Sequence, residues 1–306
     1  MSRSAEVSAS CLTGAAVIAL TNPLDCLKQR WQVEQSIGSA RGGLFSFTRQ
    51  ILREEGLFRG LWTPGIGSNT VACTCSVGAR LGLYPLLRDS LALPGSKASG
   101  TSMFLSGLTG GALGYIVGAP FFCAARMAQA EAGALDATGQ HYVTGARKGH
   151  PPTVRGGNGG LGMLSHIART QGVVGLWRGS TVLVARGAIM SATQLATYDL
   201  TKVRLRALGL ADGPVMHSAA SLVASLTLTT AICPLDVTYT YYTCGGMLGR
   251  SFDSPLACGR ALLQEGGPAA LLRGWVPLWA RFLPSSFLTF HIYEQSRKLL
   301  LGKYLD

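Results

Sequence analysis

Three copies of one pattern, each about 100 residues long, constrain this chain more than any other feature of its sequence. Each copy runs through an apolar stretch, a proline, a polar loop, an Arg-Gly pair and a second apolar stretch ending in Tyr-x-x-x-basic. The prolines are Pro23, Pro120 and Pro234. A pattern that recurs three times in the same order predicts three structural units of one kind, stacked or packed together.

The remaining landmarks set the limits of the repeats. The Arg-Gly pairs are Arg59-Gly60, Arg178-Gly179 and Arg273-Gly274. The closing pairs are Tyr84 with Arg88, Tyr198 with Lys202 and Tyr293 with Arg297. From these positions we expect repeat 1 at residues 1–95, repeat 2 at 96–207 and repeat 3 at 208–306.

Six apolar stretches accompany the repeats, two in each. They run near residues 8–27, 66–85, 103–123, 179–200, 214–241 and 276–297. Most are about 20 residues long, the length that a helix needs to cross ~30 Å of hydrocarbon. Their Asn, Ser, Thr, Gln and Arg residues favour a bundle interior over lipid. The sequence therefore predicts an all-α membrane protein, with six transmembrane helices in three pseudo-symmetric two-helix repeats around a central cavity.

The charge balance agrees with a membrane protein that handles anions. Charged residues make up only 14% of the chain and apolar residues 47%, whereas soluble proteins carry about 25% charged residues. Lys and Arg outnumber Asp and Glu by 27 to 15, but they are scattered, so we expect no nucleic-acid partner. The eight cysteines show no metal-ligand spacing, which predicts mostly reduced thiols and no metal site.

Positions twelve residues before each closing tyrosine lie at one depth, because twelve helical residues span about 18 Å. They are Ala72, Arg186 and Arg281, and the positions four residues before each tyrosine are Arg80, Gln194 and Thr289. An intramembrane arginine costs ~2.5–3.5 kcal/mol on insertion scales and persists where it faces water or an anion. Its planar guanidinium suits a carboxylate or sulfate. These six residues are the predicted substrate site; bonding of the arginines to helix carbonyls is the alternative.

The segment TNPLDCLKQRWQ matches the signature P-x-[D/E]-x-x-[K/R] in full, with Asp25 as its acid and Lys28 as its base. Three repeats of this kind resemble the mitochondrial carrier family over nearly the whole chain. The other two signatures are degenerate. Phe122 and Ala125 replace the acid and the base of the second, whereas the third keeps Asp236 and has Tyr239 in place of the base.

This degeneracy also resembles one branch of that family, the oxaloacetate/sulfate carriers. Further similarities to the branch are VGARLGLY at 77–84 and PLDV at 234–237, and ARFLPSSFLTFHIYEQ at 280–295 is similar to the wider dicarboxylate and oxoglutarate carriers. The resemblance implies a multi-pass protein of the mitochondrial inner membrane. It would move small dianions such as oxaloacetate, related dicarboxylates or sulfate by alternating access, in exchange for another anion.

The resemblance also implies a gate at each end of the cavity. At the matrix gate the acid of one repeat pairs with the base of the next, which leaves Asp236 with Lys28 as the one complete bridge. Asp25 would face Ala125, Phe122 would face Tyr239, and Arg126 would partly replace the missing base. Gln32 and Gln129 would brace this gate. The cytoplasmic gate would consist of Arg88, Asp199, Lys202, Glu294 and Arg297. Exchanging the charges of Lys28 and Asp236 is predicted to restore part of the transport lost in the single mutants.

The implied partners are a small anionic substrate and membrane lipid, including cardiolipin, for a monomer that needs no cofactor. Nucleophile elbows, P-loops and HExxH motifs are absent from the sequence, which argues against an enzyme. Both termini would face the cytoplasm, and the loop at 135–160 with His141 and His150 is expected to be a flexible matrix-side insertion. The alternatives are a carrier for another small anion and a carrier-fold receptor or scaffold that has lost transport.

Overall fold

The computed structural model describes residues 3–37, 42–91, 100–154, 160–207, 209 and 214–282, with isolated positions up to Ile292. Several side chains inside these ranges lie outside the description. Among them are Arg80, Arg88, Gln194, Asp199 and Lys202.

Long α-helices form nearly all of the described chain, which contains isolated β-bridges but no β-strand in those ranges. The helices are α1 (Arg3–Ile37), α2 (Leu44–Glu54), α3 (Ile66–Leu91), α4 (Gly100–Glu131), α5 (Gly160–Gly175), α6 (Ser180–Ala207), α7 (Pro214–Cys244) and α8 (Pro255–Ala270). A π-helix, η1 (Phe58–Trp62), and a 3-10 helix, η2 (Gly245–Leu248), lie between them. Five of the six predicted apolar stretches fall inside α1, α3, α4, α6 and α7, and the sixth is helical at 275–282.

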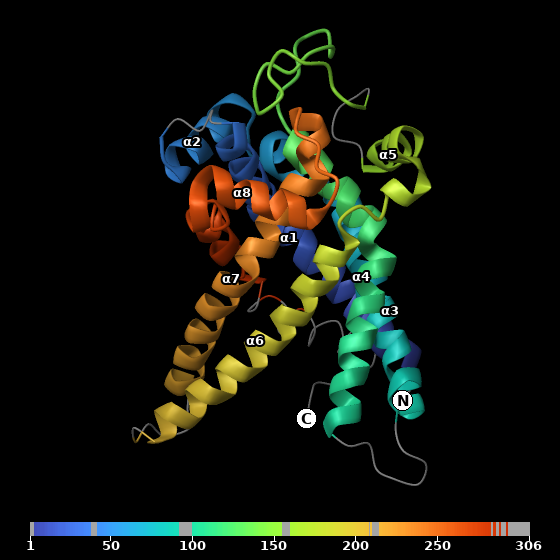
Figure 1. Cartoon of the computed structure of the whole chain (residues 1–306), viewed down its shortest axis with the longest axis vertical. Helices are drawn as coiled ribbons and strands as arrows, with labels where there is room; N and C mark the ends of the chain where they lie inside the picture. The colour runs from blue at the N-terminus through green and yellow to red at the C-terminus, as the bar shows by residue number, and fades with distance from the viewer. Residues whose placement is uncertain are drawn as a thin grey trace.

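The long helices converge at one end of the molecule and diverge at the other (Figure 1). The short helices α2, α5 and α8 lie at the convergent end, which we call the closed end, and α1 begins at the opposite, open end. Three long helices that each contain an internal proline, α1, α4 and α7, contact one another. Because an internal proline removes one helical hydrogen bond and permits a kink, its recurrence in these three helices accounts for their convergence.

Two segments of the described chain, Leu108–Glu131 and Ala219–Met247, are long and apolar enough to cross a membrane by length and composition alone. The bent pair Gly162–Gly175 and Ser180–Met190, with 82° between its halves, would be a third if it formed one span. The other long helices contain more charged and polar residues, several of which line the interior described below.

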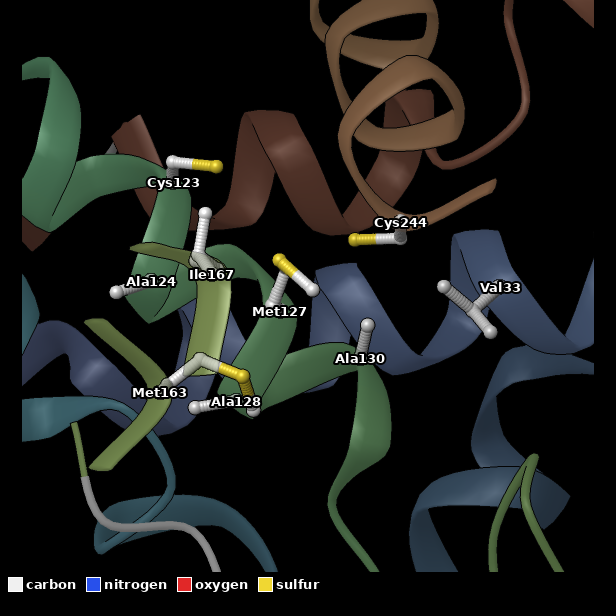
Figure 2. Close-up of a cluster of buried hydrophobic side chains, with 9 residues drawn as sticks. All are labelled: Val33, Cys123, Ala124, Met127, Ala128, Ala130, Met163, Ile167 and Cys244. Carbon is white, nitrogen blue, oxygen red and sulfur yellow. The ribbon is translucent and has the colours of Figure 1, made fainter. Parts of the chain in front are cut away.

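Small and flexible side chains pack the closed end (Figure 2). This hydrophobic cluster consists of Val33, Cys123, Ala124, Met127, Ala128, Ala130, Met163, Ile167 and Cys244. The alanines on α4 let neighbouring helices approach, and Met163 and Ile167 of α5 fill the space against them. Full burial of each of these two larger side chains contributes about 1.5–3 kcal/mol. The cluster therefore fixes α5 to the side of the closed end. All eight cysteines are free thiols.

One glycine in each repeat adopts a left-handed backbone just before α3, α6 or the helical segment 275–282. These are Gly65, Gly179 and Gly274, with φ of +67°, +82° and +83°. A Cβ atom on them would lie 2.7–3.2 Å from atoms of Gln129, Thr243 and Gln32, respectively. The three glycines are therefore equivalent positions, each packed on the proline-containing helix of another repeat.

This equivalence corrects the landmark used for repeat 1. The sequence suggests that Arg59-Gly60 corresponds to Arg178-Gly179, but Gly60 does not have a left-handed backbone and packs on Ile51 and Glu55. The corresponding residue is Gly65, which follows the π-helix η1. Repeat 1 thus contains additional residues at this junction, where the chain forms the π-helix η1.

Candidate functional site

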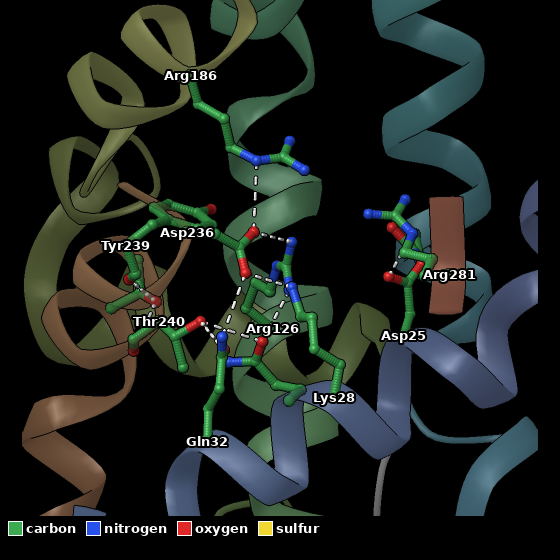
Figure 3. Close-up of polar contacts among 12 residues, drawn as sticks. Asp25, Lys28, Gln32, Arg126, Arg186, Asp236, Tyr239, Thr240 and Arg281 are labelled. Atoms are coloured by element: carbon green, nitrogen blue, oxygen red, sulfur yellow. Dashed lines mark hydrogen bonds and ion pairs between the residues drawn. The ribbon is translucent and has the colours of Figure 1, made fainter. Parts of the chain in front are cut away.

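Three basic side chains surround the carboxylate of Asp236 on α7. Lys28 Nζ of α1 lies 2.6 Å from Asp236 Oδ2, and Arg186 Nε of α6 and Arg126 Nη2 of α4 lie 3.3 and 3.5 Å from Oδ1. Asp236 and Lys28 are completely buried. The structure therefore contains the predicted Asp236–Lys28 contact, and it adds two arginines that join α4 and α6 to the same carboxylate (Figure 3).

Asp25, the other acid of the predicted matrix gate, forms a separate ion pair (Figure 3). Its Oδ1 lies 2.7 Å from Arg281 Nε, and its Oδ2 accepts a hydrogen bond of 3.4 Å from Asn69 Nδ2. The ring of signatures left Asp25 opposite Ala125 and missed Arg281 as its partner. The signal was present in the sequence, since Arg281 is one of two cations predicted at the substrate depth and Asp25 lacked a counter-ion.

The two predicted substrate arginines are therefore ion-paired with the two gate acids. Neither pair is complete: Arg186 Nε and Asp25 Oδ1 are buried without a hydrogen-bond partner in the described part of the chain, despite their ion-pair distances. A buried polar atom left without such a partner is costly. Arg186 Nε thus offers a donor that a bound ligand could use, whereas Asp25 Oδ1 is an acceptor.

The predicted glutamine braces lie beside the ion pairs, but only one of them contacts a charged group. Gln32 Nε2 donates to Asp236 Oδ2 at 3.4 Å and to the carbonyl of Arg273 at 3.2 Å. Gln129 Nε2 donates to Asn22 Oδ1 at 3.1 Å. Gln32 therefore links the Asp236 cluster to the segment before 275–282, whereas Gln129 joins α4 to α1.

Aromatic packing occupies the part of the gate where the second acid and the third base are missing. Phe122 and Tyr239 belong to one hydrophobic cluster with Ala119, Val182 and Leu183. The guanidinium of Arg126 lies 5.8 Å from the centre of the Tyr239 ring, within the range of a cation–π contact. The prediction that Phe122 would face Tyr239 agrees with this packing.

A cavity of about 150 Å³ is lined by several of these groups. Its lining includes charged and polar side chains from four helices and the segment 275–282, among them Asp25, Asn69, Ser76, Arg126, Gln129, Arg186 and Arg281. Ala72, predicted at the substrate depth, is fully buried, and its carbonyl would lie 2.9 Å from a Cβ at Gly118 of α4. Ala72 therefore lies at the α3–α4 contact, and its neighbours Cys73 and Ser76 line the cavity in its place.

The positions predicted at one depth are equivalent in the structure. Ala72, Arg186 and Arg281 each follow the left-handed glycine of their repeat by the same interval (65 to 72, 179 to 186 and 274 to 281). The spacing from the closing tyrosines and the spacing from the left-handed glycines thus give the same alignment of the three repeats. Arg80, Gln194 and Thr289 and the cytoplasmic-gate residues Arg88, Asp199, Lys202, Glu294 and Arg297 lie outside the described side chains, and their roles stay predictions.

Positive charge exceeds negative charge in this buried cluster. Its described members are the cations Lys28, Arg126, Arg186 and Arg281 and the carboxylates Asp25 and Asp236, which leaves two positive charges uncompensated. Buried charge is unfavourable unless it is paired. An anion with two negative charges would balance the charge of the cluster. Among the described residues, no group of His, Cys, Asp and Glu could hold a metal ion.

The loop predicted at residues 135–160 to be flexible is held by hydrogen bonds and ion pairs in its described part, residues 135–154, which contradicts that expectation there. Glu131 Oε1 accepts a hydrogen bond from the backbone of Thr153 at 2.5 Å and lies 3.2 Å from Arg147 Nη1. Thr144 Oγ1 donates to Glu55 Oε1 at 2.6 Å, and Glu55 is also paired with Arg30 of α1. The loop therefore ties repeat 1 to repeat 2 at the closed end.

Two ionisable groups in this loop reflect its order. A hydrogen bond from Thr138 lowers the pKa of the Asp136 carboxyl, and burial raises the pKa of the Tyr142 phenol above its usual range. Tyr142 is almost completely buried. Its aromatic ring is the residue-level signal that this segment packs, although the surrounding glycines suggest a flexible loop.

The chain is similar in sequence to known mitochondrial carrier proteins. The family model described as "Mitochondrial carrier protein" matches residues 2–93, 96–207 and 211–304. The mitochondrial 2-oxoglutarate/malate carrier protein of Mus musculus is 29% identical over 301 residues, which cover 96% of this chain and 90% of that protein. Its namesake in Caenorhabditis elegans is 28% identical over 92% of this chain and 88% of the relative. The mitochondrial substrate carrier family protein ucpB of Dictyostelium discoideum is 28% identical, covering 95% and 92%.

Proposed function

This chain belongs to the mitochondrial carrier family of multi-pass inner-membrane proteins, and from that premise we propose that it transports small dicarboxylates by alternating access. The members of this family are transporters and not enzymes. The relatives named for 2-oxoglutarate and malate support a dicarboxylate as the substrate class. The motifs shared with the oxaloacetate/sulfate branch make oxaloacetate and sulfate further candidates.

The surplus of two buried positive charges is the observation that carries the proposal. A dicarboxylate or sulfate brings two negative charges and acceptor oxygens that match guanidinium donors. Arg186 has an unused donor, and the cavity that Arg186 and Arg281 line would hold a short dianion. A cationic substrate would add to a charge that the described residues already leave uncompensated.

Transport requires the cavity to open alternately at each end. The structure is closed where α1, α4 and α7 converge, and we assign this end to the matrix, as the resemblance in sequence implies (Figure 1). The dianion would enter from the open end and compete with Asp236 and Asp25 for the arginines. Loss of those contacts would weaken the closed end, so binding and opening are coupled through shared groups.

Uptake into liposomes containing the purified protein tests the proposal. Labelled malate, 2-oxoglutarate, oxaloacetate and sulfate would be compared with a basic amino acid and ATP, with and without an internal counter-anion. Saturable uptake of at least one small dianion is expected, stimulated by a counter-anion if transport is exchange. Uptake of only the amino acid or ATP would refute the substrate class, and no uptake at all would favour the receptor or scaffold alternative.

A further inference from the structure

The second repeat has lost both charged residues of its signature but carries a cation one residue later, at Arg126. The equivalent positions in the other repeats, six residues after each proline, are Gln29 and Thr240. These three side chains meet: Arg126 Nη1 donates to Gln29 Oε1 at 2.7 Å, and Thr240 Oγ1 donates to the same oxygen at 3.2 Å. Arg126 is therefore held centrally among α1, α4 and α7, where it also lines the cavity floor.

Arg126 and Lys28 differ in their burial and in their distance from the Asp236 carboxylate. Lys28 is completely buried and lies 2.6 Å from the carboxylate. The Arg126 side chain keeps 10% of its surface exposed, and its nearest carboxylate oxygen, at 3.5 Å, is the one that Arg186 also approaches. Its shortest polar contact is to the neutral amide of Gln29. A guanidinium has five N–H donors, and the described hydrogen bonds occupy only two of its nitrogens, Nη1 and Nη2.

Three guanidiniums thus border one cavity from three directions: Arg126 from α4, Arg186 from α6 and Arg281 from the segment 275–282. We propose that Arg126 is a third substrate-contacting cation and that it determines the preference for doubly over singly charged anions. This inference rests on the proposed function. One carboxylate of the substrate binds Arg126 at the cavity floor, and the other lies between Arg186 and Arg281.

A role in the gate alone would give a different pattern of effects. If Arg126 only held Asp236, its loss would alter transport of every substrate to the same degree, because the gate does not distinguish ligands. If it contacts the substrate, its loss weakens binding of the anion that used the contact. The discrimination between two ligands that differ by one charge therefore separates the two roles.

The test measures inhibition of labelled dicarboxylate uptake by succinate and by monomethyl succinate, which has a similar shape and one negative charge fewer. In Arg126→Gln the inhibition constant of succinate should rise roughly tenfold to a hundredfold, the loss expected for one charge-assisted hydrogen bond. That of the monoester should change much less. Arg126→Lys, which keeps the charge, should retain part of the discrimination, and Arg169→Gln on the exposed face of α5 is the matched control.

Equal changes for both inhibitors, or none, would overturn the role of Arg126 while leaving dicarboxylate transport intact. If wild-type protein takes up no dicarboxylate, the proposed function itself fails. Thermal unfolding with and without succinate provides a second readout that does not need transport. Succinate should stabilise wild type more than Arg126→Gln or Arg126→Lys; equal stabilisation of all three would also overturn the proposal. If Arg126→Gln does not fold, the lysine variant alone decides between these outcomes.

Discussion

The two acids at the closed end, Asp236 and Asp25, have different numbers of cationic partners. Three cations approach Asp236, whereas Asp25 has Arg281 and an amide from Asn69. Removing one member of a buried ion pair typically costs 3–5 kcal/mol, because its partner is left uncompensated. The same change in charge should therefore have different effects on the two sides of the Lys28–Asp236 pair.

Asp236→Asn should impair transport and stability more than Lys28→Gln. The first change leaves three cations without their shared carboxylate, whereas the second leaves Asp236 with Arg126 and Arg186. We expect Asp236→Asn to lower the free energy of unfolding by about 3 kcal/mol or more, with a smaller loss for Lys28→Gln. Thermal unfolding of the purified variants and uptake in liposomes would measure both effects. A larger loss in Lys28→Gln would contradict the shared role of Asp236.

Exchanging the two charges, Lys28→Asp with Asp236→Lys, should not restore transport. A lysine at position 236 would lie beside Arg126 and Arg186, so the exchange would place three cations together. The signature alone predicts partial recovery, because it shows one isolated pair and not its neighbours. Uptake by the double variant compared with each single variant tests this directly, and recovery above both singles would mean that the arginines move away from Asp236 in the working protein.

The sequence could identify the charged residues of this site but not all of their contacts. Spacing from the tyrosines placed Arg186 and Arg281 at one depth, and the signature paired Asp236 with Lys28. The sequence could not show that Arg186 and Arg281 contact the gate acids. A long arginine side chain extends several ångströms from its backbone, so the backbone position does not fix its partner. For Arg126 the signature predicts only a partial replacement of the missing base, because the residue is displaced by one position; its contact with Gln29 does not follow from the sequence.

Among the elements, the long helices follow from the sequence and the junction in repeat 1 does not. Apolar stretches of membrane length, each with one internal proline, specify α1, α4 and α7. The π-helix η1 contains Arg59-Gly60, which has the same sequence as the Arg-Gly motif of the other repeats but is not the structurally equivalent position. An alignment on this pair therefore misses the additional residues of repeat 1. Pro64-Gly65 is a second turn signal nearby, and only the backbone angle of Gly65 shows which signal is structurally equivalent.

Gly65→Ala should destabilise the protein, whereas Gly67→Ala two residues later should not. Gly65 has φ +67°, and a Cβ there would lie 2.8 Å from the carbonyl of Ala125. The left-handed conformation alone costs an alanine about 1–2 kcal/mol, and the contact adds to this. A Cβ at Gly67 meets nothing within 4 Å, and alanine favours the helix there. Equal melting temperatures for the two variants would contradict the assignment of Gly65 to the interface with α4.

The folded loop at residues 132–154 makes a prediction for proteolysis. Glu131→Ala removes the acceptor for Arg147 and for the backbone of Thr153, so trypsin should cleave after Arg147 or Lys148 several times faster. Thr138→Ala, at the exposed tip with a bond only to Asp136, is the control and should leave the rate unchanged. Fragment mass and cleavage rate in detergent provide the measurement. Unchanged cleavage in Glu131→Ala would show that other contacts hold the loop.

At the scale of the whole molecule, three repeats of two spans place both termini on the same side of the membrane. We expect that side to be the cytoplasmic one, with the short helices α2, α5 and α8 and the folded loop facing the matrix. Protease added to intact mitochondria with a ruptured outer membrane should remove a tag from either end of the chain. A tag that is protected until the inner membrane is solubilised would reverse the assigned orientation.

The uncompensated cations of the described cluster also bear on how the carrier responds to voltage. The cluster carries two positive charges when empty and none when it holds a dianion. Each charge that crosses a membrane potential of 100 mV changes in energy by about 2.3 kcal/mol. If the site holds a dianion as proposed, we expect reorientation of the empty site to be electrogenic and that of the loaded site to be electroneutral. Exchange of one dianion for another should therefore not depend on the membrane potential. One-way transport should depend on it, because the empty site crosses the membrane with its positive charge.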